Sequence, residues 1–551
     1  MFDTRSARAA GMFPCFALLW ALATLVHQLS FTFWLQTWEG WLLTFATCLV
    51  VLEPRCVVRF SALLVFSLLN LWQKLPFVPN HMLFEGMLNV TILIVTIGVV
   101  SQAGLGFPGW VLIEREFVRR FRAFFVAGGA KAAFLMATEA PRNPLLGGAT
   151  SGVLLLGLGQ ALAGRPPQPR GGEEIIARVS PILRVQAVIV YWWAAIQKLN
   201  WDYLNPEVSC GADLHRDMAS FLPFLPTADW ALYGAIYGSL ALEFGIPVLL
   251  LIRRTRPFGF LLGVLFHLWL SIHPAGGIYS FSALLFALYF LFLPATAVAE
   301  WQRLTRAQLA WLRRRCPVSL ETWLPRIVIA VFLAGVLSQA ICYTVLGRTR
   351  DTFEVANRIG FWLWAIFGLW SGGTHVAASW RVRHESLEWP HRPAGSVAWL
   401  AVLLVLGNGL NPWIGLKTQT CFSMYSNLRS EAFGNHLFLK RVDHFGYQRD
   451  LVELVKSEPD LLDPTGSPTR LQHFANHGKI FPYFELRRLV SEYEGNVRLV
   501  YRRHGEELKF ERQVGNVTGD ERLNEPIPLL LRKFLWFRRY ETFYGPMYCT
   551  H

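Results

Sequence analysis

Long apolar runs separated by short charged loops extend from Met12 to Leu416. Hydrophobic residues make up 53% of the 551-residue chain and charged residues only 16%, which is too apolar for an ordinary soluble protein. An apolar helix of this kind satisfies its own backbone hydrogen bonds inside a bilayer. Since roughly 20 residues cross the bilayer, the sequence predicts an all-α polytopic membrane helix bundle of about 11–13 spans.

The first and the middle apolar runs need interpretation. The run Met12–Leu29 has the length of a signal peptide, but no clear small-x-small cleavage site follows it, so we interpret it as a retained first helix. The runs Glu116–Met136 and Gly147–Ala163 are ambiguous and could add one membrane hairpin. A helix beginning near Pro181 follows a proline- and glycine-rich loop. The other expected spans are Trp41–Leu52, Val57–Trp72, Leu83–Val100, Trp230–Ile252, Phe258–Ile272, Tyr279–Leu293, Ile327–Leu346, Ile359–Gly372 and Val397–Leu416.

The charges in the loops predict the orientation. Loops 253–256 and 313–315 are the densest basic loops, and basic loops stay in the cytoplasm. The loop that follows the helix beginning near Pro181 is acidic and is expected outside. Counting spans from these loops places the N-terminus in the cytoplasm and residues 417–551 outside it. The sequence therefore predicts two domains, a membrane domain at 1–416 and an extracytoplasmic domain at 417–551.

The tail, residues 417–551, has the pattern of a small α+β domain. Val497–Arg502 and Leu508–Glu511 alternate between apolar and polar residues around His504-Gly505, which predicts a β-hairpin. Pro482–Tyr493 has the apolar spacing of a helix. Pro528–Tyr540 mixes basic and large apolar residues and is either a helix lying on the bilayer surface or an ordinary buried helix of the tail.

The net charge of +14 sits in short loops and at helix ends. Since the sequence also lacks zinc-finger spacing, a helix-turn-helix and a phosphate-binding glycine loop, we do not expect nucleic-acid binding. None of the eight cysteines forms a CxxC motif, so no metal site is expected. Cys421 and Cys549 both lie in the tail, and we predict that they pair.

Lys198 is the clearest candidate for chemistry. It stands near the end of the apolar run Ile189–Tyr203. Apolar surroundings favour the neutral amine over the ammonium, and the neutral amine can act as a base. An ionisable residue at membrane depth is therefore a functional-site hypothesis. The alternative is that this lysine extends its charge to the lipid headgroups without any chemical role.

Other polar residues interrupt the neighbouring apolar runs. A lone membrane histidine is more often a packing residue than a catalyst. A group of such residues in nearby spans is expected to meet one another or a ligand, because an unpaired polar group in a dry bundle is costly. His81, Glu85 and Asn89 share one helix face at a spacing of four residues. The further candidates are Asn80, Tyr191, Glu243, His267 and Tyr279.

These residues resemble a known family. The segment from Arg184 to Tyr203 resembles the lysine helix of vitamin K-dependent gamma-carboxylase, and Asn80-His81 resembles the family's asparagine-histidine pair. Phe266-His267 and Gly277–Ser282 resemble two further stretches of that family. Weaker similarity extends to Phe422–Ser426 and Val497–Arg502. The wider group is the HTTM superfamily of membrane bundles, and the similarity is good over residues 55–295.

The resemblance implies a specific chemistry. Lys198 matches the base that deprotonates vitamin K hydroquinone, and His81 matches the histidine that supports the reaction. Asn80, Tyr191, Glu243, His267 and Tyr279 are then expected to bind the quinone or the substrate. The cofactors would be vitamin K hydroquinone or a related quinol, O2 and CO2, without a metal. Epoxidation of the quinol would drive carboxylation of a glutamate or another acceptor, and burial would keep water from the strong base.

Two departures from the family leave alternatives open. Gln197 stands where the family has the first lysine of a pair, and the tail is much shorter than the region that grips the protein substrate in eukaryotic carboxylases. A non-catalytic scaffold, or a lipid- or quinone-binding protein, is the main alternative. A transporter ranks lower, because the sequence shows no pair of similar halves with broken helices. The expected partners are membrane lipids and a lipid-soluble quinone, with a peptide or protein substrate left open.

Overall fold

A computed structural model describes most of the chain. The two ambiguous runs, at 116–136 and 147–163, lie outside the described residues, so the predicted hairpin there stays a prediction. The described residues are 11–30, 37–102, 172–273, 278–315, 320–345, 350–383, 395–431, 434–440, 442, 444–461, 471–513, 516–538 and 545–549.

The chain divides into two compact units. Unit 1 consists of Met1–Asn70, Glu85–Val188 and Gly245–Val402. Unit 2 consists of Leu71–Phe84, Ile189–Phe244 and Leu403–His551. Each unit therefore combines segments that are far apart in the sequence. The predicted boundary between residues 416 and 417 follows composition alone and stays a prediction.

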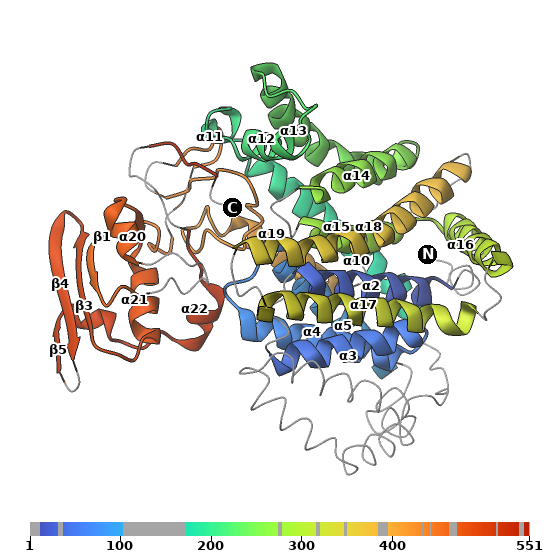
Figure 1. The fold of residues 1–551 in the computed structure, drawn as a ribbon, viewed down its shortest axis with the longest axis horizontal. Helices are drawn as coiled ribbons and strands as arrows, with labels where there is room; N and C mark the ends of the chain where they lie inside the picture. Colours follow the sequence, from blue (N-terminus) through green and yellow to red (C-terminus); the bar gives the residue numbers. More distant parts are fainter. Residues whose placement is uncertain are drawn as a thin grey trace, which may run out of the picture. The chain divides into compact units, whose positions relative to one another are not determined.

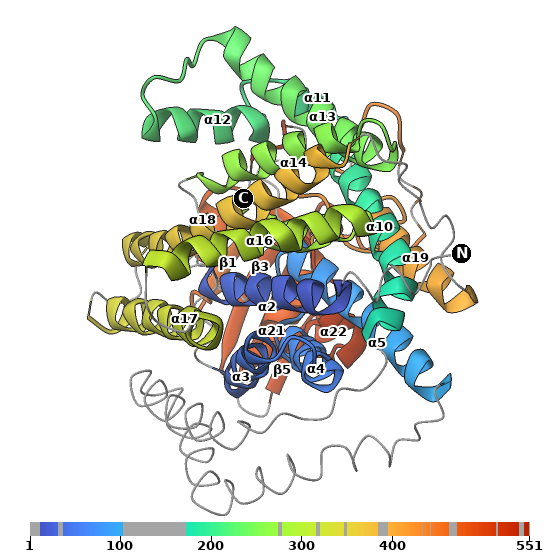
Figure 2. The ribbon, with the colours of Figure 1, turned by 90° about the vertical axis from the view of Figure 1, so that its right-hand side faces the viewer.

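Apolar helices build unit 1. Helix α2 packs against α3, α15 and α18, and α18 also contacts α14, α16 and α17 (Figures 1 and 2). Local sequence sets some of the helix ends, as at α3, where the Thr37 side chain accepts a hydrogen bond from the Gly40 N–H. The helices are α2 (Met12–Ser30), α3 (Trp38–Leu52), α4 (Val57–Lys74), α5 (Asn80–Gln102), α10 (Gly172–Ile196), α13 (Asp229–Leu251), α14 (Arg256–Ser271), α15 (Ile278–Phe290), α16 (Ala295–Arg315), α17 (Leu320–Val345), α18 (Arg350–Arg381) and α19 (Gly395–Leu410), of which α4, α5, α10, α13 and α19 continue into unit 2.

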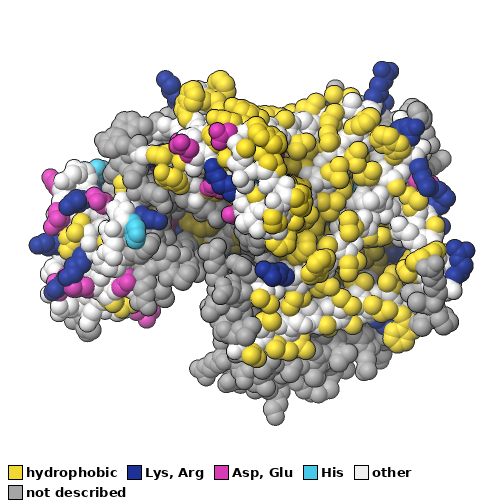
Figure 3. All heavy atoms as spheres, turned by 45° about the horizontal axis from the view of Figure 1, so that its top comes forward, with side chains coloured by type: hydrophobic (Ala, Val, Ile, Leu, Met, Phe, Trp, Pro, Cys, Tyr) yellow, Lys and Arg dark blue, Asp and Glu magenta, His cyan; other side chains and the backbone are white. Residues whose placement is uncertain are grey.

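The membrane bundle is confirmed. Among the described residues, four helices are long and apolar enough to cross a bilayer, or up to five if the bent pair α15–α16 is one span. Further apolar helices are shorter, and hydrophobic side chains cover much of the surface of the helical region (Figure 3). The total of 11–13 spans includes segments outside the described residues and stays a prediction.

Helix α16 differs from the expectation. Arg313–Arg315 were expected in a loop, but they form the end of this helix, which is bent by 120° from α15. Its exposed side includes arginines together with Trp311 and Leu312. Such a basic amphipathic helix is typical of a segment that lies in the membrane interface.

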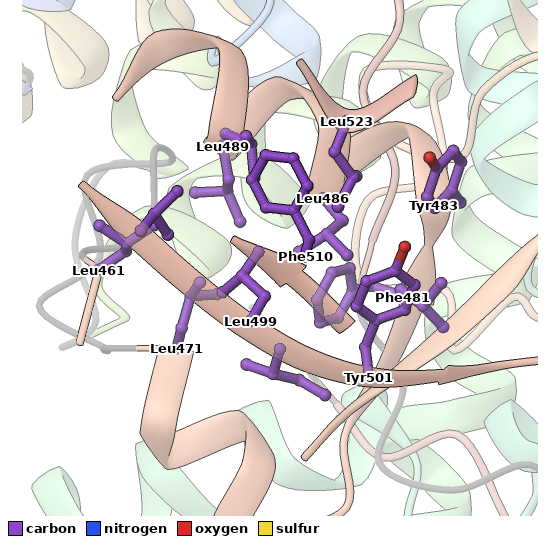
Figure 4. Packing of buried hydrophobic residues seen from close by; sticks show 14 residues of the cluster. Leu461, Leu471, Phe481, Tyr483, Leu486, Leu489, Leu499, Tyr501, Phe510 and Leu523 are labelled. Atoms are coloured by element: carbon purple, nitrogen blue, oxygen red, sulfur yellow. The ribbon is translucent and has the colours of Figure 1, made fainter. Parts of the chain in front are cut away.

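The tail forms the small α+β region that the sequence predicts. Five antiparallel strands are ordered β2-β1-β3-β4-β5, and leucine, phenylalanine and tyrosine side chains from the sheet meet those of α21 in one core (Figure 4). The elements are β1 (Leu451–Glu458), α20 (Leu471–Asn476), β2 (Ile480–Pro482), α21 (Tyr483–Glu492), β3 (Val497–Arg503), β4 (Glu506–Gln513), β5 (Asn516–Gly519) and a 3-10 turn, η3 (Glu521–Leu523).

The predicted hairpin and the predicted helix are both confirmed. Strands β3 and β4 pair from Val497↔Arg512 to Arg503↔Glu506. His504 and Gly505 between them have φ of 54° and 84°, the left-handed geometry of the tight turn that matches the strand twist. The helix expected at 482–493 is α21, whose buried face includes Leu486, Leu489 and Val490.

The helix expected at 528–540 is much shorter than predicted. Of the described residues in this range, only α22 (Leu529–Phe534) is helical, and it has no buried residue. The chain then leaves the helix, and Leu535 and Phe537 enter a small core with Phe484 and Ile527. These apolar side chains are therefore buried by an extended segment, whereas the sequence pattern predicted a helix. Whether α22 lies on the bilayer stays open.

A shared carboxylate ties the sheet to the η3 turn. The Tyr501 hydroxyl donates to Asp520 Oδ2 at 2.5 Å, and the Tyr483 hydroxyl donates to the same oxygen at 2.7 Å. We expect Tyr501→Phe to lower the free energy of unfolding of the tail by about 1.5–3 kcal/mol, because the bond is made to a charged group. Denaturation followed by circular dichroism measures this change. Tyr483→Phe is the matched control, and a double variant no worse than either single variant would show that the two bonds act as one unit.

The predicted disulfide is wrong. Cys549 pairs with Cys210, and Cys421 is a free, buried thiol. The reason lies in Asn427, whose amide donates to the carbonyls of Val208 (2.8 Å) and Met547 (2.7 Å) and so holds the two segments that carry the paired cysteines. The Cys421 sulfur instead contacts the Thr418 carbonyl at 3.2 Å.

Candidate functional site

Lys198 lies in a tight turn after α10, within unit 2. Helix α10 ends at Ile196, and α11 (Trp201–Leu204) begins after Asn200, whose side chain accepts a hydrogen bond from the Tyr203 N–H. Lys198 donates its own N–H to the Ala195 carbonyl at 3.1 Å, which continues the helical turn. The residue is only 5% exposed, so its side chain points into the protein.

The Lys198 amine meets a carboxylate. Its Nζ lies 2.5 Å from Glu243 Oε1, and Glu243 on α13 is 8% exposed. The second oxygen, Glu243 Oε2, is buried and has no hydrogen-bond partner among the described residues. The turn therefore brings a buried amine to one oxygen of a buried carboxylate whose other oxygen has no hydrogen-bond partner among the described residues.

Tyr203 forms a wall of this site. Its ring centre lies 5.9 Å from Lys198 Nζ, and its hydroxyl is 2.6 Å from Ser239 Oγ. Burial, followed by the Glu243 carboxylate, raises the pKa of Tyr203, so its hydroxyl stays protonated. Tyr203 also belongs to an apolar core with Cys210, Ile236 and Leu240, which keeps the site dry.

A buried loop at residues 418–431, named here the 418–431 loop, accepts hydrogen bonds from the turn at residues 197–200, named here the lysine turn. Gln197 Nε2 donates to the Cys421 carbonyl at 2.8 Å and to the Gly409 carbonyl at 3.2 Å. Asn200 Nδ2 donates to the Ser426 carbonyl at 2.6 Å. The residues on either side of Lys198–Leu199 are thus bonded to the loop. Gln197 therefore has a positioning role at the place where the family resemblance expects a lysine.

The 418–431 loop is strained. Thr420, Phe422, Tyr425 and Asn427 have φ between 48° and 65°, the left-handed region that side chains other than glycine disfavour. Each such residue costs about 1–3 kcal/mol and persists only where its surroundings hold it, often at functional sites. Arg538 supplies part of that hold, because its guanidinium donates to the Leu428 carbonyl at 2.6 Å and to the Thr418 carbonyl at 3.0 Å.

We expect Gln197→Leu to loosen the lysine turn, because it leaves the Cys421 and Gly409 carbonyls without this donor. The loss should be about 1–3 kcal/mol of folding free energy. Thermal unfolding of the purified protein measures it. Gln197→Lys is the control, since it keeps a donor of similar reach, and equal losses in both variants would contradict the positioning role.

Asn80 and His81 begin helix α5 in unit 2. Asn80 Oδ1 accepts a hydrogen bond from the Phe422 N–H at 2.6 Å, so this predicted ligand residue supports the 418–431 loop. His81 is buried at 5% exposure. Tyr191 is also buried, on α10 two turns before Lys198. Binding of a quinone by any of these three residues stays a prediction.

His267 and Tyr279 belong to unit 1. The His267 ring packs edge-on against Phe266, Phe281 and Tyr289. The Tyr279 hydroxyl donates to Asn357 Oδ1 at 2.8 Å. Lys198 and His81 belong to unit 2, so the expectation that these polar residues meet one another or a ligand stays untested for His267.

Unit 1 holds a second buried polar cluster, only part of which the sequence pattern predicts. His27 Nδ1 on α2 lies 2.7 Å from Glu85 Oε2 on α5. Ser67 on α4 donates to Glu85 Oε1 at 3.3 Å, and Asn89 Nδ2 donates to Ser67 Oγ at 2.9 Å. Glu85 and Asn89 were expected on one face. His27 and Ser67 were missed, although each is a polar residue inside an expected span.

One comparison with known proteins finds a match. Residues 173–296 match the model of the HTTM domain. This segment is an HTTM domain. No curated protein and no solved structure matches the chain. The HTTM match and the apolar helices together indicate an integral membrane protein.

The HTTM domain contains only part of the site. Lys198 and Glu243 lie within the matched residues, as do Tyr191, His267 and Tyr279. Asn80, His81 and the 418–431 loop lie outside them. The Lys198–Glu243 pair thus lies within the residues that match the HTTM domain, while the 418–431 loop comes from a later part of the chain.

Proposed function

We propose that this protein is a carboxylase-like membrane enzyme in which Lys198 deprotonates a reduced quinone. The observation that carries the proposal is the buried Lys198–Glu243 pair with its unpartnered oxygen, Glu243 Oε2. A buried ion pair is poor evidence for added stability, so its presence beside an open acceptor favours a chemical role.

The donor set fits a quinol hydroxyl. Glu243 Oε2 accepts the hydroxyl hydrogen bond and orients the group, while Lys198 Nζ is held at the other carboxylate oxygen. The pair shares one proton and has no net charge, whether it is written as ammonium and carboxylate or as amine and carboxylic acid. In the amine and carboxylic acid form, Lys198 takes up the hydroxyl proton and becomes an ammonium, while Glu243 stays a neutral acid. The ammonium then lies beside the new oxyanion, and the two charges attract in a site shielded from water.

The chemistry that the bound quinol would supply is a reaction with O2 that produces a strong base, as the family resemblance implies. This chain's residues would hold the proton on Lys198 and exclude water from the site. Tyr203 and the apolar core to which it belongs exclude the water, which matters because bulk water would quench a strong base. A glutamate side chain or another acceptor with an acidic C–H bond would then take up CO2.

The direct test is quinone epoxide formation. Purified protein in lipid nanodiscs is supplied with vitamin K hydroquinone and O2, and the products are separated by chromatography. The expected result is epoxide that requires the protein, and labelled CO2 in an added acceptor shows whether carboxylation follows. If none of a series of naphthoquinols and benzoquinols gives epoxide, the result would favour a non-catalytic HTTM scaffold or a quinone-binding protein.

A further inference from the structure

An apolar cavity of about 510 Å³ lies between α14 and α18 in unit 1, named here the α14–α18 groove. Aliphatic side chains such as Leu261, Leu265 and Leu369 line it, and Arg381 stands among them as the one charged lining residue. Small residues keep the groove open. A Cβ added at Gly373 would meet no atom within 4 Å. This volume and lining suit one hydrocarbon chain.

Arg381 lies at a defined end of the groove. Phe258, near the start of α14, contacts Trp380, near the end of α18, with ring centres 5.3 Å apart. The end with Arg381 is therefore the end at which α14 begins, directly after Arg253 and Arg254. This is the end that the basic loop predicts to be cytoplasmic.

The described residues at this end carry mainly positive charge. The Arg383 guanidinium stacks over the Trp380 ring at 5.2 Å. Glu300 on α16 contributes a carboxylate, but it is already bonded to Arg381 and Arg303, both at 2.7 Å. Among the described residues at this end, the Glu300 carboxylate therefore stands beside the guanidinium groups of Arg381 and Arg303, and the Arg383 guanidinium adds further positive charge. Guanidinium groups bind phosphate oxygens in a planar, bidentate manner.

We propose that the α14–α18 groove binds an anionic phospholipid, with one acyl chain along the leucines and the phosphate at Arg381 and Arg383. An acyl chain matches the apolar lining, and the negative headgroup matches the arginine end. A zwitterionic lipid supplies the same chain without the net charge. The site lies in unit 1 and does not depend on the proposed chemistry of Lys198.

Photo-crosslinking tests the site. The intact protein is placed in nanodiscs with a phosphatidylglycerol that carries a diazirine on one acyl chain, and in a second sample with the matching phosphatidylcholine. Labelled peptides are then mapped by mass spectrometry. The expected result is labelling of residues 256–271 and 369–383, about fivefold stronger with phosphatidylglycerol for each arginine that contacts the headgroup. Equal labelling by the two lipids overturns the proposal.

Matched variants distinguish binding in the groove from general contact between the protein and lipid. Gly373→Leu fills the groove and should abolish labelling of α18, whereas Gly238→Leu on α13, where an added Cβ also meets no atom within 4 Å, should leave it unchanged. If Gly373→Leu does not fold, Ala377→Leu fills the same groove. Arg383→Gln should remove most of the preference for phosphatidylglycerol and keep the chain labelling.

Two other results would contradict the assignment. Equal loss of labelling in Gly373→Leu and Gly238→Leu would mean that the labelled surface is ordinary bilayer contact. Displacement of the labelled phosphatidylglycerol by a neutral isoprenoid quinone, with the quinone crosslinking to the same peptides, would assign the groove to the quinone tail.

Discussion

Replacing Lys198 by methionine is expected to reduce quinone epoxide formation by about 10²–10⁴-fold, the usual contribution of a general base. Methionine keeps much of the volume of the buried side chain, so the loss reflects the missing amine rather than a cavity. The measurement is the epoxide assay in nanodiscs at saturating quinol. Chemical rescue of a second variant, Lys198→Ala, by a small added primary amine would strengthen the assignment, because the shortened side chain leaves space for the amine beside Glu243.

The chain provides a matched control for this result in a second buried lysine of unit 2. Lys417 is 5% exposed and donates to Thr420 Oγ1 at 3.2 Å, and burial lowers its pKa to about 8. Lys417→Met should therefore retain most of the activity if Lys198 is the base. Robust activity in Lys198→Met together with its loss in Lys417→Met would move the base to Lys417 and remove Lys198 from that role.

Glu243→Gln separates the two members of the pair. The amide keeps an acceptor and the shape of the side chain, but it removes the negative charge that stabilises the ammonium form of Lys198. We expect activity to fall less than in Lys198→Met. An unchanged rate in Glu243→Gln would show that the carboxylate has no part in the reaction.

Loss of the Cys210–Cys549 disulfide is expected to destabilise unit 2 by about 2–5 kcal/mol. The bond closes a loop across a sequence separation of 339 residues, so its removal greatly increases the freedom of the unfolded chain. Cys210 also belongs to the core around Tyr203. Cys210→Ser should therefore lower the thermal midpoint and weaken epoxide formation. Thermal unfolding under non-reducing conditions measures the first effect.

Cys421→Ser is the control for the disulfide. Cys421 is a free, buried thiol of unit 2, so its replacement changes one sulfur atom without opening a crosslink. A similar loss in Cys210→Ser and Cys421→Ser would show that the effect comes from core packing rather than from the crosslink. Intact mass before and after alkylation confirms which cysteines are paired.

Elements with local, regular patterns could be predicted from the sequence. The apolar runs gave the membrane helices, and the alternation at 497–511 gave the β3–β4 hairpin, because each pattern reflects contacts within a few residues. The helix at 528–540 was overestimated, since its mixture of apolar and basic residues fits both a surface helix and an extended segment that enters a core.

The details of the site could be predicted only in part. Lys198 stood out because a charge in an apolar run is rare, but its pairing with Glu243 requires α13 to pass beside the turn after α10, which no local pattern encodes. The strained 418–431 loop was missed as a supporting element, because left-handed residues other than glycine have no sequence signature. The disulfide partner was wrong for a similar reason. Asn427 positions Cys549 through backbone carbonyls, and a carbonyl is common to every residue.

The Cys210–Cys549 crosslink also sets an order for biosynthesis. The lysine turn and Cys210 are synthesised early, but Cys549, which closes the core behind the turn, is translated 339 residues after Cys210. A nascent chain therefore carries Lys198 and Glu243 for most of its synthesis without covalent closure around them. Disulfides form in oxidising compartments, and the charge pattern of the loops predicts that the tail lies outside the cytoplasm, so on that prediction closure follows the crossing of the tail. Maturation of the site would then depend on translocation of the tail, and a failed translocation would leave a membrane-inserted but incomplete protein.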